Sequence, residues 1–240
     1  MKNKTKLLFA GILAAFLMLA VPFAVVSFDA DDADATSYTE VGNWDQLETA
    51  INNSEISAIK FVNNIVYESD TEGEYGLQIT RSMEIDGNGY TLSRMTESSV
   101  DNWGFVNISG IGNGEVTIKG LTIDFAGGNR SRSINVVESQ NLTLNIFNTK
   151  INNGTHYPLF IGSDSVNVNI TSSGEKDKES ELRGYCAIRI EANNASINVT
   201  DTRLIGNNTY SGVTSSYCTI MVNNGCSANI LSHNIPPLMT

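Results

Sequence analysis

Residues 133–200 contain three consecutive blocks with the same order of residue types, and this repeat constrains the fold more than any other feature. The blocks cover residues 133–146, 157–171 and 185–200. Each has a short apolar run, a polar bend, and a second run in which Asn or Thr alternates with Val, Ile or Leu. Such alternation places one row of side chains in a core and the other row in solvent. Each block is therefore predicted to be a pair of half-buried strands.

The repeat continues on both sides of these blocks, at spacings of 24 to 32 residues. First strands are predicted to begin near Trp103, Ser133, Tyr157, Tyr185 and Tyr217. Second strands are predicted at 115–118, 142–146, 166–170, 196–199 and 228–231, and a weaker third set at 121–123, 149–151, 181–183 and 203–205. A unit that returns every 20–50 residues is typical of a solenoid. The sequence predicts an all-β fold, a right-handed parallel β-helix of about six coils, with residues 172–180 as a corner loop.

Composition agrees with a chain of many tight turns. The sequence has 28 Asn residues, and Asn tolerates left-handed backbone at bends. Three of the four Pro lie near the chain ends, so few ladder donors are lost from the body. The formal net charge of -11, with no basic stripe, repels phosphate backbones and argues against a nucleic-acid partner.

Residues 1–35 are predicted to be a targeting segment. Lys2, Lys4 and Lys6 precede an uncharged apolar run at 7–26. The small-x-small sequence Ala33-Asp-Ala35 favours cleavage of a signal peptide. The alternative is an uncleaved anchor, since about 20 apolar residues can span a bilayer. We therefore expect a secreted or cell-surface protein, either released or held in the membrane by residues 7–26, with residues 36–240 forming the β-helix.

A single helix is predicted at about residues 43–52. Asn43 can cap its first turn, with Gln46 three residues on. One face carries the apolar residues Trp44, Leu47, Ala50 and Ile51. The first coil of a solenoid exposes an open apolar end, which has to be covered. The helix is therefore predicted to be an N-terminal cap, followed by a strand at 58–62.

The bends and the cap carry a family resemblance. The Asn-rich corner and alternating strand of residues 192–200 resemble right-handed parallel β-helix proteins of the pectate-lyase-like superfamily. The cap at Asn43-Trp-Asp-Gln-Leu, followed by a strand, resembles the N-terminus of adhesin-like surface members. The resemblance covers roughly residues 40–235 and implies the fold. The superfamily includes polysaccharide lyases, glycosidases, autotransporter passengers and non-catalytic adhesins, so it does not by itself choose an activity.

Acidic side chains follow the first strands of consecutive coils. Glu138, Asp164 and Glu191 occupy this place, with Asn223 in the next coil. If stacked in register, neighbours would lie roughly 5 Å apart. Such a column could bind Ca²⁺, which prefers oxygen ligands. The alternative, which we favour, is a row of turn residues, so no metal ligand is assigned.

Enzyme activity is the competing interpretation. A lyase needs Ca²⁺-binding carboxylates and a basic residue, for which Arg183, Arg189 and Arg203 are available, but none has a recognisable lyase context. A glycosidase needs two carboxylates about 5–9.5 Å apart. After residue 35 the sequence has no Asp-Asp or Asp-x-Asp pair. We therefore assign no catalytic or cofactor-binding residue, and keep a polysaccharide lyase or glycoside hydrolase as the alternative.

The remaining candidates are aromatic, thiol and imidazole groups. Tyr157, Tyr185 and Tyr217 occupy matching positions and predict a stacked column, structural or exposed as a sugar platform. Cys186 and Cys218 would be adjacent, as free stacked thiols in preference to a disulfide. His156 and His233 are isolated in the sequence, and surface roles are expected for both.

Nine Asn-x-Ser/Thr sequons follow the leader, and the pattern predicts that they lie on strand faces or corners open to solvent. They are at Asn52, Asn107, Asn129, Asn141, Asn153, Asn169, Asn194, Asn198 and Asn207. Several would be glycosylated in a host that modifies exported proteins. The sequence as a whole predicts an exported, non-catalytic, adhesin-like surface protein that presents a repetitive sheet face to glycans or proteins.

Overall fold

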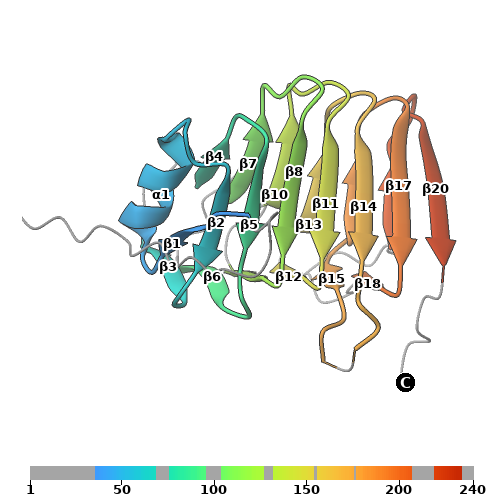
Figure 1. Ribbon diagram of the computed structural model, residues 1–240. Coiled ribbons are helices and arrows are strands. Elements are labelled where there is room, and N and C mark those ends of the chain that lie inside the picture. Colours follow the sequence, from blue (N-terminus) through green and yellow to red (C-terminus); the bar gives the residue numbers. More distant parts are fainter. Residues whose placement is uncertain are drawn as a thin grey trace, which may run out of the picture.

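The computed structural model describes residues 36–68, 76–95, 104–126, 132–153, 156–175, 177–206 and 219–233. These residues form one helix and twenty strands (Figure 1). The predicted leader, Trp103, Tyr217 and Cys218 lie outside the described residues, as do the sequons at Asn129 and Asn207.

The strands form three parallel sheets that run the length of the molecule. Sheet 1 contains β1 (Thr39–Val41), β2 (Ala58–Phe61), β5 (Met83–Asp86), β8 (Glu115–Lys119), β11 (Thr143–Phe147), β14 (Asn167–Thr171), β17 (Ala195–Thr200) and β20 (Ala228–His233). Sheet 2 contains β4 (Leu77–Ile79), β7 (Val106–Ser109), β10 (Arg132–Val137), β13 (Tyr157–Ile161), β16 (Ile188–Ile190) and β19 (Ile220–Val222). Sheet 3 contains β3 (Ile65–Glu68), β6 (Thr91–Met95), β9 (Thr122–Ala126), β12 (Lys150–Asn153), β15 (Glu181–Gly184) and β18 (Arg203–Gly206).

Neighbours within each sheet come from successive coils, and Figure 1 shows the strands of sheet 1 side by side from the N-terminal to the C-terminal end. This arrangement is a parallel β-helix, as predicted. The three predicted strand sets fall in sheets 2, 1 and 3, respectively. Strands β1 and β3 were not predicted, because each is short and neither has an alternating run long enough to stand out.

The core consists of inward rows that stack from coil to coil. In sheet 1, Ile85, Ile118, Ile146, Ile170 and Val199 are paired in register and are all buried. Burying one aliphatic side chain of this size contributes about 1.5–3 kcal/mol. Because the pairing is continuous, each coil covers the apolar surface of the next, and the stacked rows stabilise the whole rod.

The corners between sheets 1 and 3 are tight turns. Gly120, Asn148 and Asp201 each begin such a corner with a positive φ, of 57°, 47° and 50°. Glycine and the short polar residues Asn and Asp are the ones that adopt left-handed backbone at low cost. These corners have only two residues between the strands, at 120–121, 148–149 and 201–202. The corner at residues 172–180 has nine, which confirms the predicted loop.

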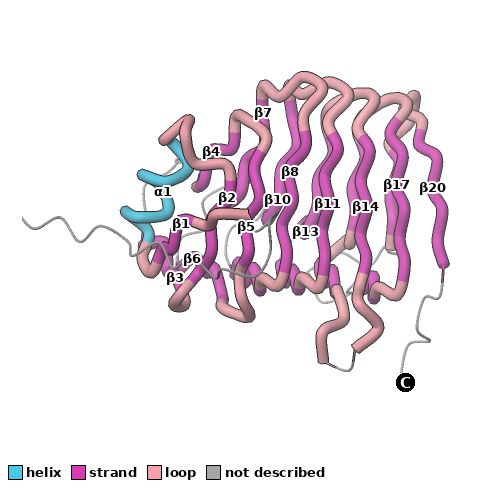
Figure 2. The backbone as a smooth tube through the Cα atoms, viewed as in Figure 1, coloured by secondary structure: helices cyan, strands magenta, loops and turns pink. Residues whose placement is uncertain are grey.

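Helix α1 (Trp44–Asn52) covers the N-terminal end of the rod (Figure 2). The Asn43 side chain accepts a 3.0 Å hydrogen bond from the backbone N–H of Gln46. The Gln46 side chain in turn accepts a 2.8 Å bond from the N–H of Gly42. This reciprocal arrangement satisfies two N–H groups at the helix start. The predicted cap is confirmed, with its first turn capped by Asn43.

The helix packs its apolar face on the first coils. Leu47, Ala50 and Ile51 are buried in the core. Trp44 is half-buried, with its ring centroid 4.1 Å from Tyr67 and 6.3 Å from Phe105. These contacts fix the helix across the open end of the solenoid. Among the described residues no helix is long and apolar enough to cross a membrane.

Candidate binding surface

The carboxylates considered for a possible column are not in register. The strand residues Val136, Ile161 and Ile190 pair with one another in register. Glu138 lies two positions after Val136, Asp164 three positions after Ile161, and Glu191 one position after Ile190. Only Asn223 is level with Glu191. The in-register column that was considered as a possible Ca²⁺ site is therefore not formed. The bends after these strands differ in path from coil to coil. Residues at similar positions in the sequence pattern therefore do not lie side by side in register.

Each of these carboxylates has a local role. Glu138 adopts a positive φ of 52° at its bend. Asp164 accepts a 2.6 Å hydrogen bond from the backbone N–H of Asn193 in the next coil. Glu191 forms a 2.7 Å ion pair with Arg189. Within the described ranges no three acidic, His or Cys side chains are grouped so that they could hold a metal ion.

The three arginines considered for base catalysis are ion-paired. Arg183 and Arg203 both contact Glu181, at 2.9 and 3.0 Å. Burial acts to lower the pKa of Arg189, but its hydrogen bond to Glu191 and nearby negative charge outweigh burial and raise the pKa. The raised pKa favours the charged form of Arg189, which does not suit a general base.

Aromatic side chains cluster on the outer side of sheet 2. The rings of Tyr157 and Tyr185 meet edge to face, with centroids 6.2 Å apart, so the predicted contact between these two is confirmed. Burial raises the pKa of Tyr157, and the charge of Arg189 partly opposes the shift. His156 was expected to be an isolated surface residue, but it belongs to this aromatic cluster. Its ring is half-buried, and the ring centroid lies 3.6 Å from that of the adjacent Tyr157.

The remaining predicted residues have separate environments. Cys186 is buried, with its Sγ 3.1 Å from the carbonyl oxygen of Ile188. Cys226 is half-buried at a bend, and His233 is exposed at the end of β20.

Burial separates the sequons, and the prediction that they are open to solvent is wrong for two of them. Asn107 and Asn153 are 7% and 0% exposed. Both are hydrogen-bonded: the Asn107 amide donates 2.8 Å to Gln78, and Asn153 accepts 2.9 Å from the N–H of His156. The exposed sequons in the described chain are Asn52, Asn141 and Asn194.

The outer side of sheet 1 is a regular surface, and it is uncharged on the strands β11, β14 and β17. The outward residues of these three strands, here called the polar face, are Thr143, Asn145, Phe147, Asn167, Asn169, Thr171, Ser196, Asn198 and Thr200. Register pairing places them in three rows across β11, β14 and β17. Parallel strands repeat at about 4.8 Å, so the hydroxyl and amide groups form a lattice with that spacing.

A ladder of side-chain amides crosses the middle row of the polar face. Asn198 donates 3.0 Å to Asn169, Asn169 donates 2.8 Å to Asn145, and Asn145 donates 2.7 Å to Glu115. A primary amide has two N–H donors and two lone pairs on its oxygen. Asn145 also donates 3.3 Å to Thr117, and each ladder amide keeps at least one lone pair that the ladder bonds do not use. The sequence contained this signal as Asn at one position in successive repeats, although two of these residues were read only as sequons.

An ion-pair cluster lies at the N-terminal end of sheet 1. Lys119 contacts Glu84 at 2.7 Å and Asp86 at 3.6 Å, and donates 2.9 Å to the Tyr38 hydroxyl. The hydroxyl of Tyr38 donates to Glu84. Burial acts to raise the pKa of Glu84, but hydrogen bonds from Lys119 and Tyr38 outweigh burial and lower it. The pKa of Lys119 is raised: burial would lower it, and its bonds to Glu84 and Tyr38 prevail.

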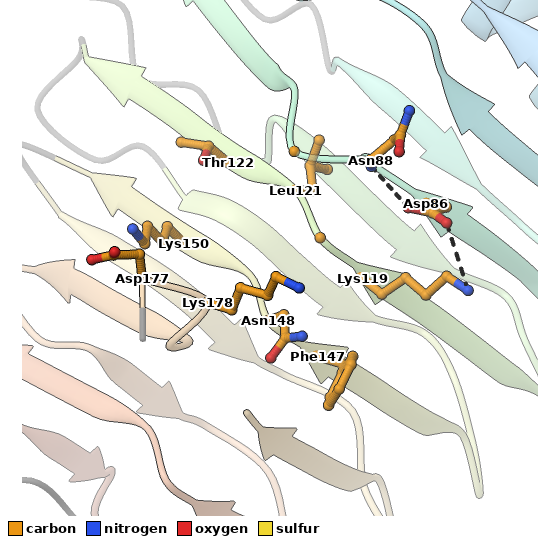
Figure 3. Close-up of a pocket in the computed structure, with 12 residues that line it drawn as sticks. Asp86, Asn88, Lys119, Leu121, Thr122, Phe147, Asn148, Lys150, Asp177 and Lys178 are labelled. Atoms are coloured by element: carbon orange, nitrogen blue, oxygen red, sulfur yellow. Dashed lines mark hydrogen bonds and ion pairs between the residues drawn. The ribbon is translucent and has the colours of Figure 1, made fainter. Parts of the chain in front are cut away.

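A groove runs along the corner between sheets 1 and 3, and the 172–180 loop forms part of its wall (Figure 3). We call it the corner groove. It has a volume of about 600 Å³ and is lined by Asp86, Asn88, Gly89, Lys119, Gly120, Leu121, Thr122, Phe147, Asn148, Lys150, Asp177 and Lys178. Four successive coils contribute to it, at the turns after β5, β8 and β11 and at the loop after β14. Sequence reasoning missed this groove, because its members are joined only through the coil register.

The fold and its polar outer surface define a solenoid of the pectate-lyase-like, adhesin-like class. The model of one protein family, the pectate lyase-like adhesive domain, matches residues 38–181. The match covers more than half of the chain, which therefore belongs to this family and is an adhesin-like repeat protein. No curated protein matches the chain. No solved structure matches it either.

Proposed function

We propose that this chain is an exported, non-catalytic surface adhesin that presents the polar face of sheet 1 to glycans or proteins. The amide ladder from Asn198 through Asn169 to Asn145 is the observation that carries the proposal. The ladder holds the amide planes in one orientation across three coils. A surface ordered before binding loses less side-chain entropy when a partner docks.

Repetition supports attachment by many weak contacts. The outward groups of β11, β14 and β17 recur at the strand spacing, so a partner with its own repeat can engage several coils together. Contacts linked in this way raise the overall avidity well above that of a single contact. The uncharged polar face also avoids the repulsion that the net charge of -11 would impose on an acidic partner.

Export is proposed from the leader at residues 1–35, with residues 36–240 as the mature β-helix. The basic residues Lys2, Lys4 and Lys6 and the apolar run at 7–26 support this division. In a host that N-glycosylates exported proteins, the exposed sequons Asn52, Asn141 and Asn194 are the proposed sites, because their side chains are open to solvent.

The test is retention of the full chain on surfaces coated with purified polysaccharides or cell-surface proteins. We expect retention on at least one surface. Replacing Asn167→Lys puts a long charged side chain on the exposed part of the polar face and is expected to weaken retention about tenfold. The matched control is Asn152→Lys, the same change at an exposed position of sheet 3. Equal retention by both variants would assign attachment to another surface.

A further inference from the structure

We propose that the corner groove binds a neutral oligosaccharide, with the Phe147 ring as the platform for one sugar. This inference rests on the proposed function, because it gives the adhesin a second, defined contact with glycans. It is carried by three independent observations: the 172–180 insertion, the exposed aromatic ring, and the balance of charges in the lining.

The insertion is not needed to close its coil. Corners of two residues make the same connection at 120–121, 148–149 and 201–202, whereas this one uses nine. The described part of the loop is held in place: Ser173 donates its N–H to the Asn148 side chain at 2.8 Å, and Ser180 donates its N–H to Ser172 at 2.7 Å. Ordering extra residues costs conformational entropy. The loop contributes Asp177 and Lys178 to the lining of the groove. We therefore infer that its extra length serves the groove and not the closure of the coil.

Phe147 is an apolar residue in an outward row whose neighbouring residues are polar. Its register neighbours on sheet 1 are Lys119 and Thr171, which are polar. The side chain of Phe147 points outward and is 37% exposed, while the adjacent Ile146 supplies the core contact. The C–H face of a pyranose can pack on such a ring, since that face of the sugar is apolar and the face of the ring is electron-rich.

The charges of the lining favour an uncharged ligand. The lining has three ammonium groups, those of Lys119, Lys150 and Lys178, and two carboxylates, those of Asp86 and Asp177. Two of the lysines are ion-paired, Lys119 with Glu84 and Asp86, and Lys178 with Glu175 at 2.6 Å. An anion would meet these carboxylates and Asp177, and a cation would meet the lysines. Sugar hydroxyl groups both donate and accept hydrogen bonds. A lining that alternates ammonium, amide and carboxylate groups therefore matches a neutral polyhydroxyl chain better than an ion.

The size and direction of the groove agree with an oligosaccharide. Its volume of about 600 Å³ lies within the range of about 300–1,000 Å³ typical of small-molecule sites. Its members come from consecutive coils, so the groove crosses the strands, and Figure 3 shows Lys119, Phe147 and Lys178 at successive places along it. A short linear ligand laid along the rod would contact each of these coils.

The test is titration of the full chain with maltotriose, cellotriose and mannotriose, and in parallel with trigalacturonate and inorganic phosphate, followed by calorimetry. We expect one neutral trisaccharide to bind. Phe147→Ala is expected to weaken its binding by about tenfold or more, and Phe147→Trp, which keeps a ring, to stay within about threefold of wild type. The melting temperature of each variant is measured to confirm that it folds.

Three results would overturn the groove proposal. They are an unchanged affinity of Phe147→Ala for the neutral trisaccharide, binding of the charged probes alone, and no binding of any of the three neutral trisaccharides. The retention assay separates these from failure of the adhesin proposal. If trisaccharides do not bind but retention still depends on Asn167, only the groove proposal is wrong. If the chain is retained on no glycan or protein surface, the adhesin proposal fails as well.

Discussion

The side-chain amide of Asn198 donates a 3.0 Å hydrogen bond to the amide oxygen of Asn169, which lies directly beside it on the neighbouring coil. Asn169 repeats the bond toward Asn145 at 2.8 Å. The outer surface of sheet 1 thus has a side-chain ladder parallel to the backbone ladder. Asn is well suited to this position because it carries both a donor and an acceptor.

Breaking the ladder is expected to cost stability. Asn169→Ala removes the acceptor of Asn198 and the donor to Asn145, and should lower the free energy of unfolding by about 1–2 kcal/mol. The control is Asn167→Ala on the same strand, at an exposed position, with an expected change within about 0.5 kcal/mol. Urea unfolding measures both. Equal effects would mean that the ladder adds no stability.

The capping helix is expected to be essential to the N-terminal coils. Leu47→Ala leaves a cavity in a fully buried site, and should cost about 2–5 kcal/mol. Asp45→Ala, at an exposed position of the same helix, is the control. Hydrogen exchange should show the largest loss of protection in β1, β3 and β4, which the helix contacts. Uniform loss along the rod would instead show that the solenoid unfolds as one unit.

The left-handed corners should discriminate among side chains. Asp201 has a φ of 50° at the start of its two-residue corner. Asp201→Val places a branched side chain in that backbone conformation and is expected to lower the free energy of unfolding by about 1–2 kcal/mol. Asp201→Gly keeps the conformation accessible and serves as the control. Thermal unfolding checks the pair, and a Val variant as stable as the Gly variant would contradict the corner geometry.

The fold was predictable because its repeat is local. Alternation in residues 142–146 and 166–170 placed β11 and β14 with their buried Leu and Ile residues on the correct face. The Asn43 cap was equally local, since its partner is three residues away. Register across the bends was not predictable in this way. Glu138 and Glu191 occupy similar places in the pattern but differ by one residue in level, because register depends on the path of each bend.

The binding surfaces were harder to predict for the same reason. The corner groove joins Asp86, Phe147 and Lys178, which are far apart in the sequence and meet only through coil stacking. The burial of Asn107 and Asn153 likewise depends on tertiary contacts that a sequon does not encode. Patterns of alternating residues report which side of a strand faces the core. They do not report which outward residues are covered by other parts of the chain.

Stability should depend on acid pH through Glu84. Its pKa in the folded chain lies below the ordinary value of 4.5, because the bonds from Lys119 and Tyr38 outweigh burial. A lowered pKa stabilises the fold fully above the unfolded pKa, and this contribution is lost as pH falls through the folded pKa. Glu84→Gln should therefore lose less stability between pH 6 and pH 3 than wild type. Urea unfolding at each pH measures the free energy of unfolding. A Glu84→Gln variant whose free energy of unfolding falls with pH as steeply as that of wild type would contradict the prediction. Glu40→Gln, at an exposed position, is the control.

The central claim is attachment without catalysis, and one measurement tests it most directly. The full chain is incubated with polyuronates and neutral polysaccharides, with and without Ca²⁺, while new reducing ends, unsaturated products and retained protein are followed. The account predicts retention on at least one polysaccharide and no new chain ends at any Ca²⁺ concentration. Turnover of any substrate would contradict it, and would direct attention to Glu191, Arg189 and the aromatic cluster on sheet 2.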